Sequence, residues 1–190
     1  LGLPRASAFP DAIALPAGTA VPQALIHERV HDMASPAWRS EHQLQRNLHE
    51  GASEHFTRQA IAGAVKQGVP VQQFSAFPGP RGTVENLAGV VGDDGLRQAY
   101  FYGDPGQMNV RMGTALGAQD PAEAERIGRN ALDTLGQALD LGLSVEVNNV
   151  MTSLRQGRGS EAQQAIMLMN QEIAGADAAN RPVVPAGGHQ

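Results

Sequence analysis

The stretch from residue 22 to residue 34 reads PQALIHERVHDMA. Its proline suits the first turn of a helix, and its larger apolar residues recur at the three- and four-residue spacing of one helical face. These apolar residues are Leu25, Ile26, Val30 and Met33. The stretch is therefore predicted to form an amphipathic helix that packs one side against the core.

The polar residues of the same stretch include a His-Glu-x-x-His string. Residues four apart lie on one face of a helix about one turn apart, so His27 and His31 can present two imidazole nitrogens to a single ion. Glu28 borders this position without being forced to bind the ion, which suits a general base acting on a water beside it. The helix is thus expected to carry two metal ligands and a base.

A second acidic segment reads HEGASE at residues 49–54. Between His31 and Glu50 lie 18 residues, enough for one helix to end, a connection to turn and a second helix to return. Glu50 is then expected to supply the third ligand. His49 is not expected to bind the ion, because its side chain diverges from that of Glu50 by about 100° around a helix.

HExxH followed after 18 residues by Glu-Gly resembles the gluzincin pattern, which thermolysin-like peptidases and a group of zinc aminopeptidases share. The resemblance implies a zinc ion held by His27, His31 and Glu50. It also implies that Glu28 is the base and proton shuttle of peptide-bond hydrolysis. The match covers about residues 25–58, and the GxMEN motif that binds the substrate amine in the aminopeptidases is absent.

Thermolysin-like enzymes also place an acidic residue four positions after the third ligand, where it orients a zinc-binding histidine. Glu54 stands at that offset, and the resemblance implies this orienting role for it. An alternative assignment makes Glu54 the ligand and places Glu50 behind it. A further alternative is that the histidines and glutamates merely form a solvated helix face.

Hydrolysis of a carbonyl also needs a group that stabilises the developing oxyanion, and Tyr, His or Arg usually supplies it. Tyr100 is the first candidate, at the end of an expected helix. A structural role for its ring is the alternative. The other candidates are His55, His42 and Arg111.

The small size, the segment NLHEGASEHFTR at residues 47–58 and the segment QAYFYGD at residues 98–104 more loosely resemble minimal metallopeptidase domains of bacterial secreted toxins and type VI effectors. This resemblance implies a protein or peptide substrate, an upstream delivery domain and an immunity protein. It also implies a cytoplasmic stay in the producing cell before export into a target cell. The first residue is Leu1 rather than Met, which fits a fragment or a processed product.

The composition excludes several other classes of protein. A net charge of −5, with 14 Lys and Arg against 19 Asp and Glu, argues against nucleic acid as the principal ligand. The chain has no cysteine, which removes disulfides, thiolate metal sites and cysteine nucleophiles. No apolar run is long enough to span a membrane, and residues 1–20 lack the pattern of a secretion signal.

The expected fold is mainly α-helical, a minimal zincin-like domain over residues 1–174 with a flexible tail at residues 175–190. Aromatic residues make up only 4% of the chain, so packing must depend on aliphatic side chains between helices. A short extended segment at Ile13–Leu15 is the one expected β element, and residues 68–82 form a Pro/Gly-rich loop. Further helices are expected at residues 40–48, 50–66, 83–91, 93–102, 105–116, 120–141, 143–156 and 159–174.

Two other functions remain open for the same residues. One is a zinc amidase that acts on a cell-wall peptide, which shares the site and differs in substrate. The other is a catalytically silent helical interaction module, in which the motif is structural.

Overall fold

The computed structural model describes residues 21–41, 45–72 and 78–179. Within them the chain is mainly α-helical, with nine helices and one pair of two-residue strands, which confirms the predicted fold class. The first elements are β1 (Val21–Pro22), α1 (Gln23–Met33), α2 (Pro36–Glu41), α3 (Arg46–Lys66) and β2 (Val71–Gln72). The others are α4 (Pro78–Val91), α5 (Asp93–Tyr102), α6 (Gly106–Ala115), α7 (Pro121–Asp140), α8 (Ser144–Arg155) and α9 (Gly159–Ala179).

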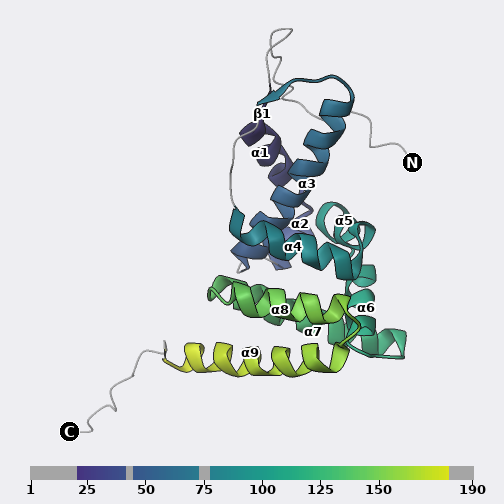
Figure 1. Cartoon of the computed structure of the whole chain (residues 1–190), viewed down its shortest axis with the longest axis vertical. Helices are drawn as coiled ribbons and strands as arrows, with labels where there is room; N and C mark the ends of the chain where they lie inside the picture. The colour runs from purple at the N-terminus through teal and green to yellow at the C-terminus, as the bar shows by residue number, and fades with distance from the viewer. Residues whose placement is uncertain (1–20, 42–44, 73–77, 180–190) are drawn as a thin grey trace, which may run out of the picture.

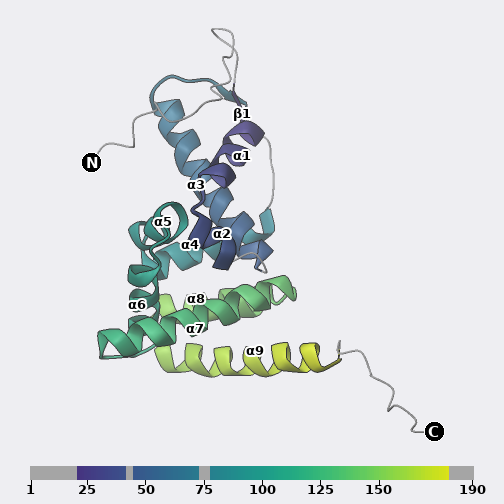
Figure 2. The same ribbon diagram turned by 180° about the vertical axis from the view of Figure 1, so that it is seen from behind.

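The helices are stacked along the long axis of the molecule (Figure 1). Helices α1 and α3 lie side by side at one end, α4 and α5 cross the middle, and α7, α8 and α9 form the other end. The reverse view shows α2 near the ends of α1 and α3 that face the middle of the molecule (Figure 2). The two segments that were expected to share an ion are therefore on neighbouring helices.

The small sheet ties the start of α1 to the connection after α3. Strands β1 and β2 are parallel, with Val21 opposite Val71, and the Val21 amide donates to the Pro70 carbonyl over 2.9 Å. Strand β2 lies within residues 68–82, which were predicted to form a loop. The expected extended segment at Ile13–Leu15 lies outside the described residues.

Helix α3 differs from its prediction in one respect that matters for the site. Two helices were expected, one ending at residue 48 and one starting at residue 50, but a single helix begins at Arg46. The Asp140 carboxylate, at the end of α7, accepts hydrogen bonds from the backbone amides of Arg46 (3.0 Å) and Asn47 (2.9 Å). A cap from another helix therefore replaces the local signal that a helix start usually carries. Glu50 consequently lies one turn inside α3.

Other boundaries also differ from the prediction. Helix α4 begins at Pro78 instead of residue 83, and α9 continues to Ala179, so the first residues of the expected tail are helical. The predicted start of α7 is confirmed, because the Asp120 carboxylate accepts from the Glu123 amide over 2.9 Å. On α1, Met33 was expected on the face that packs against the core but is 42% exposed.

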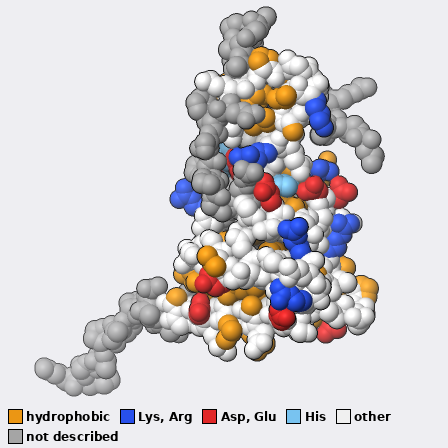
Figure 3. All heavy atoms as spheres, in the orientation of Figure 1, with side chains coloured by type: hydrophobic (Ala, Val, Ile, Leu, Met, Phe, Trp, Pro, Cys, Tyr) orange, Lys and Arg blue, Asp and Glu red, His pale blue; other side chains and the backbone are white. Residues whose placement is uncertain are grey.

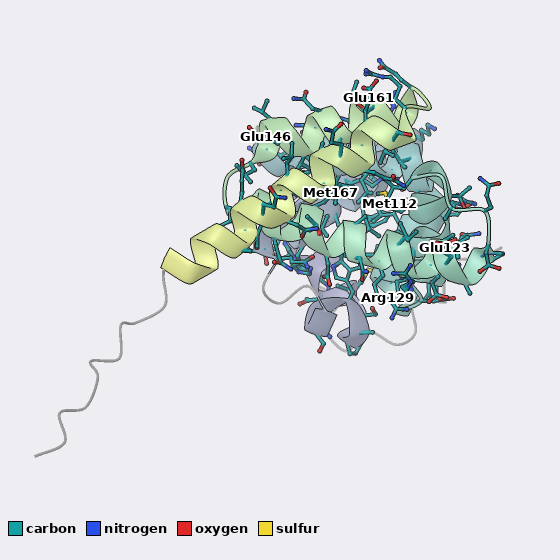
Figure 4. The ribbon with its side chains drawn as sticks, turned by 90° about the horizontal axis from the view of Figure 1, so that it is seen from below. Met112, Glu123, Arg129, Glu146, Glu161 and Met167 are labelled. Atoms are coloured by element: carbon teal, nitrogen blue, oxygen red, sulfur yellow. The ribbon has the colours of Figure 1, made fainter. Side chains whose placement is uncertain are left out.

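The core is built from aliphatic side chains between closely packed helices. Helices α6 and α7 approach at two glycines: a Cβ on Gly113 would lie 1.9 Å from the Ala124 carbonyl oxygen, and one on Gly128 would lie 1.8 Å from that of Asn109. Only glycine permits backbones to come this close. The methionines mostly fill this core, Met112 being fully buried, although Met167 on α9 is 62% exposed (Figure 4).

The described surface carries charged and apolar side chains interspersed. The face shown in Figure 3 has basic and acidic groups near its middle and hydrophobic side chains toward both ends, the one formed by α1 and α3 and the one formed by α8 and α9. In the described residues, no helix is both long enough and apolar enough to cross a bilayer.

Candidate metal centre

Three side-chain atoms from α1 and α3 converge on one point. The Nε2 atoms of His27 and His31 lie 3.0 Å apart, and the Glu50 Oε2 atom lies 3.5 Å from the first and 3.2 Å from the second. Ligands bound at about 2.0–2.1 Å to a tetrahedral ion are separated by roughly 3.3 Å. The triangle therefore has the size of one face of such a coordination shell, and the three atoms can bind one metal ion.

The helical spacing explains how the sequence builds this triangle. His27 and His31 are one turn apart on α1, and their rings meet edge to face with centroids 4.6 Å apart. Helix α3 lies alongside α1 and presents Glu50 to both rings. His27 is buried, whereas His31 and Glu50 are partly exposed, so the point of convergence lies at the surface of the helix pair.

The inner nitrogen of His27 faces two oxygen atoms on α3. Glu54 Oε2 lies 3.4 Å from His27 Nδ1, and Thr57 Oγ1 lies 3.5 Å from it. The Thr57 hydroxyl donates its hydrogen to the Ser53 carbonyl over 2.7 Å, so its lone pairs face the ring. Both neighbours favour a proton on Nδ1, which leaves the Nε2 lone pair directed at the cluster.

Glu54 is buried behind His27, and its other oxygen is held in place. Its Oε1 accepts from Arg58 Nε over 3.0 Å and from Gln23 Nε2 over 3.4 Å. The Oε2 atom accepts no hydrogen bond among the described residues, so it acts on His27 through its negative charge, 3.4 Å from Nδ1 and away from Nε2. This placement fits the orienting role and not the alternative in which Glu54 is the ligand.

His31 has two neighbours at its inner nitrogen, and they favour opposite tautomers. Ser53 Oγ, 3.0 Å away, can accept a proton from Nδ1, which leaves Nε2 free for a metal. His49 Nε2 lies 2.9 Å away, and Trp38 donates to His49 Nδ1 over 2.9 Å. Neutral His49 therefore carries its proton on Nε2 and donates to His31. Of the two contacts, the one with Ser53 is compatible with metal binding through Nε2.

Tyr100 lies beneath the cluster and not in the cleft, so its predicted contact with the substrate oxyanion is wrong. Its side chain is fully buried, and its hydroxyl donates to the Val30 carbonyl over 3.1 Å and lies 2.7 Å from Ser53 Oγ. Burial raises the pKa of this phenol to about 12. The hydroxyl has no free direction toward a substrate, and its partners make it a support for Ser53.

The other candidates for oxyanion stabilisation also lie away from the cleft. His55 Nε2 lies 2.9 Å from the Asp93 carboxylate, and Arg111 donates to the Val91 carbonyl over 2.9 Å. Neither residue lines the cleft beside the cluster. His42 lies outside the described residues.

The triangle of ligand atoms opens into a cleft of about 590 Å³. Glu28 is exposed at its wall, and no hydrogen bond or ion pair involves its carboxylate among the described residues. A carboxylate in this position is available to accept a proton from a water in the cleft. The lining residues are His27, Glu28, His31, Arg46, Asn47, His49 and Glu50.

Sequence reasoning missed Ser53, Thr57 and Arg46 as parts of the site. Together with Glu50 and Glu54 they follow helical spacing along α3, and this polar stripe was the available signal. The expected break between helices at residues 40–48 and 50–66 separated only Arg46 from this stripe, because Ser53 and Thr57 fall within the second expected helix.

The donor set fits zinc. Two imidazole nitrogens and one carboxylate oxygen, with one side open to a cleft, form the arrangement of catalytic zinc sites that have three protein ligands. Comparison of the chain with known proteins finds no matching family model, no matching curated protein and no matching solved structure.

Proposed function

We propose that this chain is a zinc-dependent metallopeptidase that hydrolyses peptide bonds in a protein or peptide substrate. One observation supports this most strongly: His27, His31 and Glu50 converge within ligand distance at the wall of a cleft. Glu28, whose carboxylate has no partner among the described residues, stands at the same wall.

Three polar residues beside the ligands have a part in such a reaction. When bound, zinc polarises a carbonyl and lowers the pKa of a coordinated water. Glu28 takes a proton from the attacking water and returns it to the amine nitrogen that leaves. The Glu54 charge beside His27 and the Ser53 hydroxyl beside His31 both favour the tautomers whose Nε2 lone pairs are free for a metal.

The biological setting that we propose is delivery into a target cell as part of a larger bacterial protein, with an immunity protein in the producer. It is supported by the loose resemblance of residues 47–58 and 98–104 to toxin and effector domains. A digest of purified peptidoglycan beside a protein substrate would separate peptidase from amidase activity.

The mechanism is tested by substituting the base and leaving the ligands intact. Purified protein is expected to hold about one zinc per chain, and Glu28→Gln is expected to keep the metal and lose hydrolysis. Metal content by atomic absorption and cleavage of a peptide mixture by mass spectrometry are the two measurements.

Glu172→Gln is the matched control, because it removes the same charge from an exposed position on α9. A fully active Glu28→Gln protein would contradict the mechanism. Zinc that remains bound without turnover on any peptide would indicate the interaction module instead.

A further inference from the structure

Among the described residues that line the cleft, Arg46 is the one lysine or arginine. It is the first residue of α3, and its backbone amide is held by Asp140. The other charged lining groups are the carboxylates of Glu28 and Glu50. A substrate in this cleft therefore meets negative charge near the metal ligands and one positive charge beside them.

The guanidinium of Arg46 makes no hydrogen bond or ion pair with the described residues. An arginine four residues before a glutamate on a helix can pair with it, yet no ion pair joins Arg46 to Glu50. Arg58, by contrast, pairs with Glu54 over 3.0 Å. The five N–H donors of Arg46 are thus available to a ligand in the cleft.

The position of Arg46 along α3 sets its distance from the cluster. Four residues of helix rise about 6 Å, so Arg46 and Glu50 are attached to α3 about 6 Å apart along the cleft that both line. One extended peptide residue spans about 3.3–3.6 Å. The separation along the helix therefore corresponds to one to two residues of an extended substrate between Arg46 and the metal ligand Glu50.

We propose that Arg46 binds the free C-terminal carboxylate of the substrate, so that the cleft removes one or two residues from the carboxyl end of a peptide. The proposal rests on the proposed metallopeptidase function. The planar guanidinium forms two parallel hydrogen bonds with a carboxylate, and its charge offsets the repulsion that Glu28 and Glu50 exert on an anionic substrate. The cleft volume of about 590 Å³ also suits a small ligand.

The reaction is ordinary hydrolysis at a defined position. The oxygen of water bonds to the carbonyl carbon one or two residues before the carboxylate, and the C–N bond breaks. The proton taken up by Glu28 goes to the amine nitrogen of the released amino acid or dipeptide. Arg46 holds the carboxylate of that leaving group and takes no part in the proton transfer.

The test compares peptides that end in a free carboxylate with the same peptides ending in an amide. With the zinc-loaded full chain, the free acids are expected to have kcat/KM about 10- to 100-fold higher, the size of a charge-assisted hydrogen bond. Mass spectrometry is expected to show loss of one or two C-terminal residues. Arg46→Gln should bring the ratio close to one, and Arg46→Lys should restore part of it.

A binding measurement gives a second readout that does not depend on turnover. In calorimetric titrations of zinc-loaded Glu28→Gln protein, the acid peptide is expected to bind about 10-fold tighter or more than its amide, and the added Arg46→Gln should remove the difference. Arg126→Gln, an exposed position on α7 outside the cleft lining, is the matched control and should preserve the preference.

Cleavage at internal bonds with no preference for the free acid would overturn this proposal and leave the peptidase function standing. Retention of the preference in Arg46→Gln would also overturn it. Absence of cleavage with every peptide would overturn both proposals together.

Discussion

Three polar residues of α3 lie in the interior, where polar groups are costly unless they are paired. Ser53, Glu54 and Thr57 are at most 1% exposed. Each faces a histidine of α1, Ser53 toward His31 and the other two toward His27. Their burial is therefore explained by the need to hold two imidazole rings in one orientation and one tautomer.

The orienting role of Glu54 predicts a loss of metal affinity when its charge is removed. Glu54→Gln keeps the size of the side chain but removes the negative charge beside His27 Nδ1, and zinc affinity is expected to fall about 10- to 100-fold. A competition titration with a zinc chelator measures this. Because Glu54 also pairs with Arg58, circular dichroism must show an intact fold. Unchanged affinity would leave Glu54 without this role.

At the level of elements, the site depends on where α3 begins. Its first turn is capped by Asp140, 94 positions after Arg46 in the chain, and the Asn47 side chain donates to the Leu139 carbonyl over 3.1 Å. The end of α7 is thus hydrogen-bonded to the turn of α3 that precedes Glu50. Docking of α7 in this way sets the position of one cleft wall.

Removal of this cap is expected to destabilise the protein. Asp140→Ala leaves the amides of Arg46 and Asn47 without their acceptor, at a cost of about 1–2 kcal/mol in the free energy of unfolding. Urea denaturation of the metal-free protein is the measurement. Glu125→Ala, which breaks an exposed pair with Arg129 on the same helix, should cost only about 0.3–0.5 kcal/mol. Equal losses in the free energy of unfolding would show that the cap stabilises the protein no more than an exposed ion pair does.

At the level of the whole molecule, Tyr100 joins three helices beneath the site. It belongs to α5, donates to the Val30 carbonyl of α1 and contacts the Ser53 hydroxyl of α3. Its ring also packs against those of Trp38 and Phe56, with centroids 5.3 and 5.1 Å away. Side chains or backbone of α1, α2 and α3 therefore all contact Tyr100 of α5.

The raised pKa of Tyr100 predicts a loss of stability in alkali. The pKa is about 12 in the folded protein and 10.0 in the exposed side chain, so between these values only the unfolded chain releases the proton. The free energy of unfolding should therefore be unaffected below pH 10 and fall by about 1.4 kcal/mol per pH unit above it.

Denaturation at pH 9, 10 and 11 checks this. Tyr100→Phe should remove that part of the pH dependence, whereas Tyr102→Phe, at a residue 61% exposed, should retain it. The same slope in wild type and Tyr100→Phe would contradict the assignment.

Local spacing was sufficient to predict most of the helices and which candidate side chains share a helical face. The four-residue interval from His27 to His31 places both rings on one face wherever the segment is helical, and the offset from Glu50 to Glu54 does the same on α3. Capping residues such as Asp120 act on the next few amides. These signals come from neighbours within one or two turns, so a single sequence contains them.

Only the tertiary structure decided that α3 starts at Arg46, that Tyr100 lies beneath the cluster and that Arg46 lines the cleft with an available guanidinium. Each depends on contacts between residues far apart in the chain, such as Asp140 with Asn47 and Tyr100 with Val30. Helical periodicity determines which side chains share a face. The packing of one helix on another determines what that face meets, because burial and capping by distant groups outweigh small local preferences.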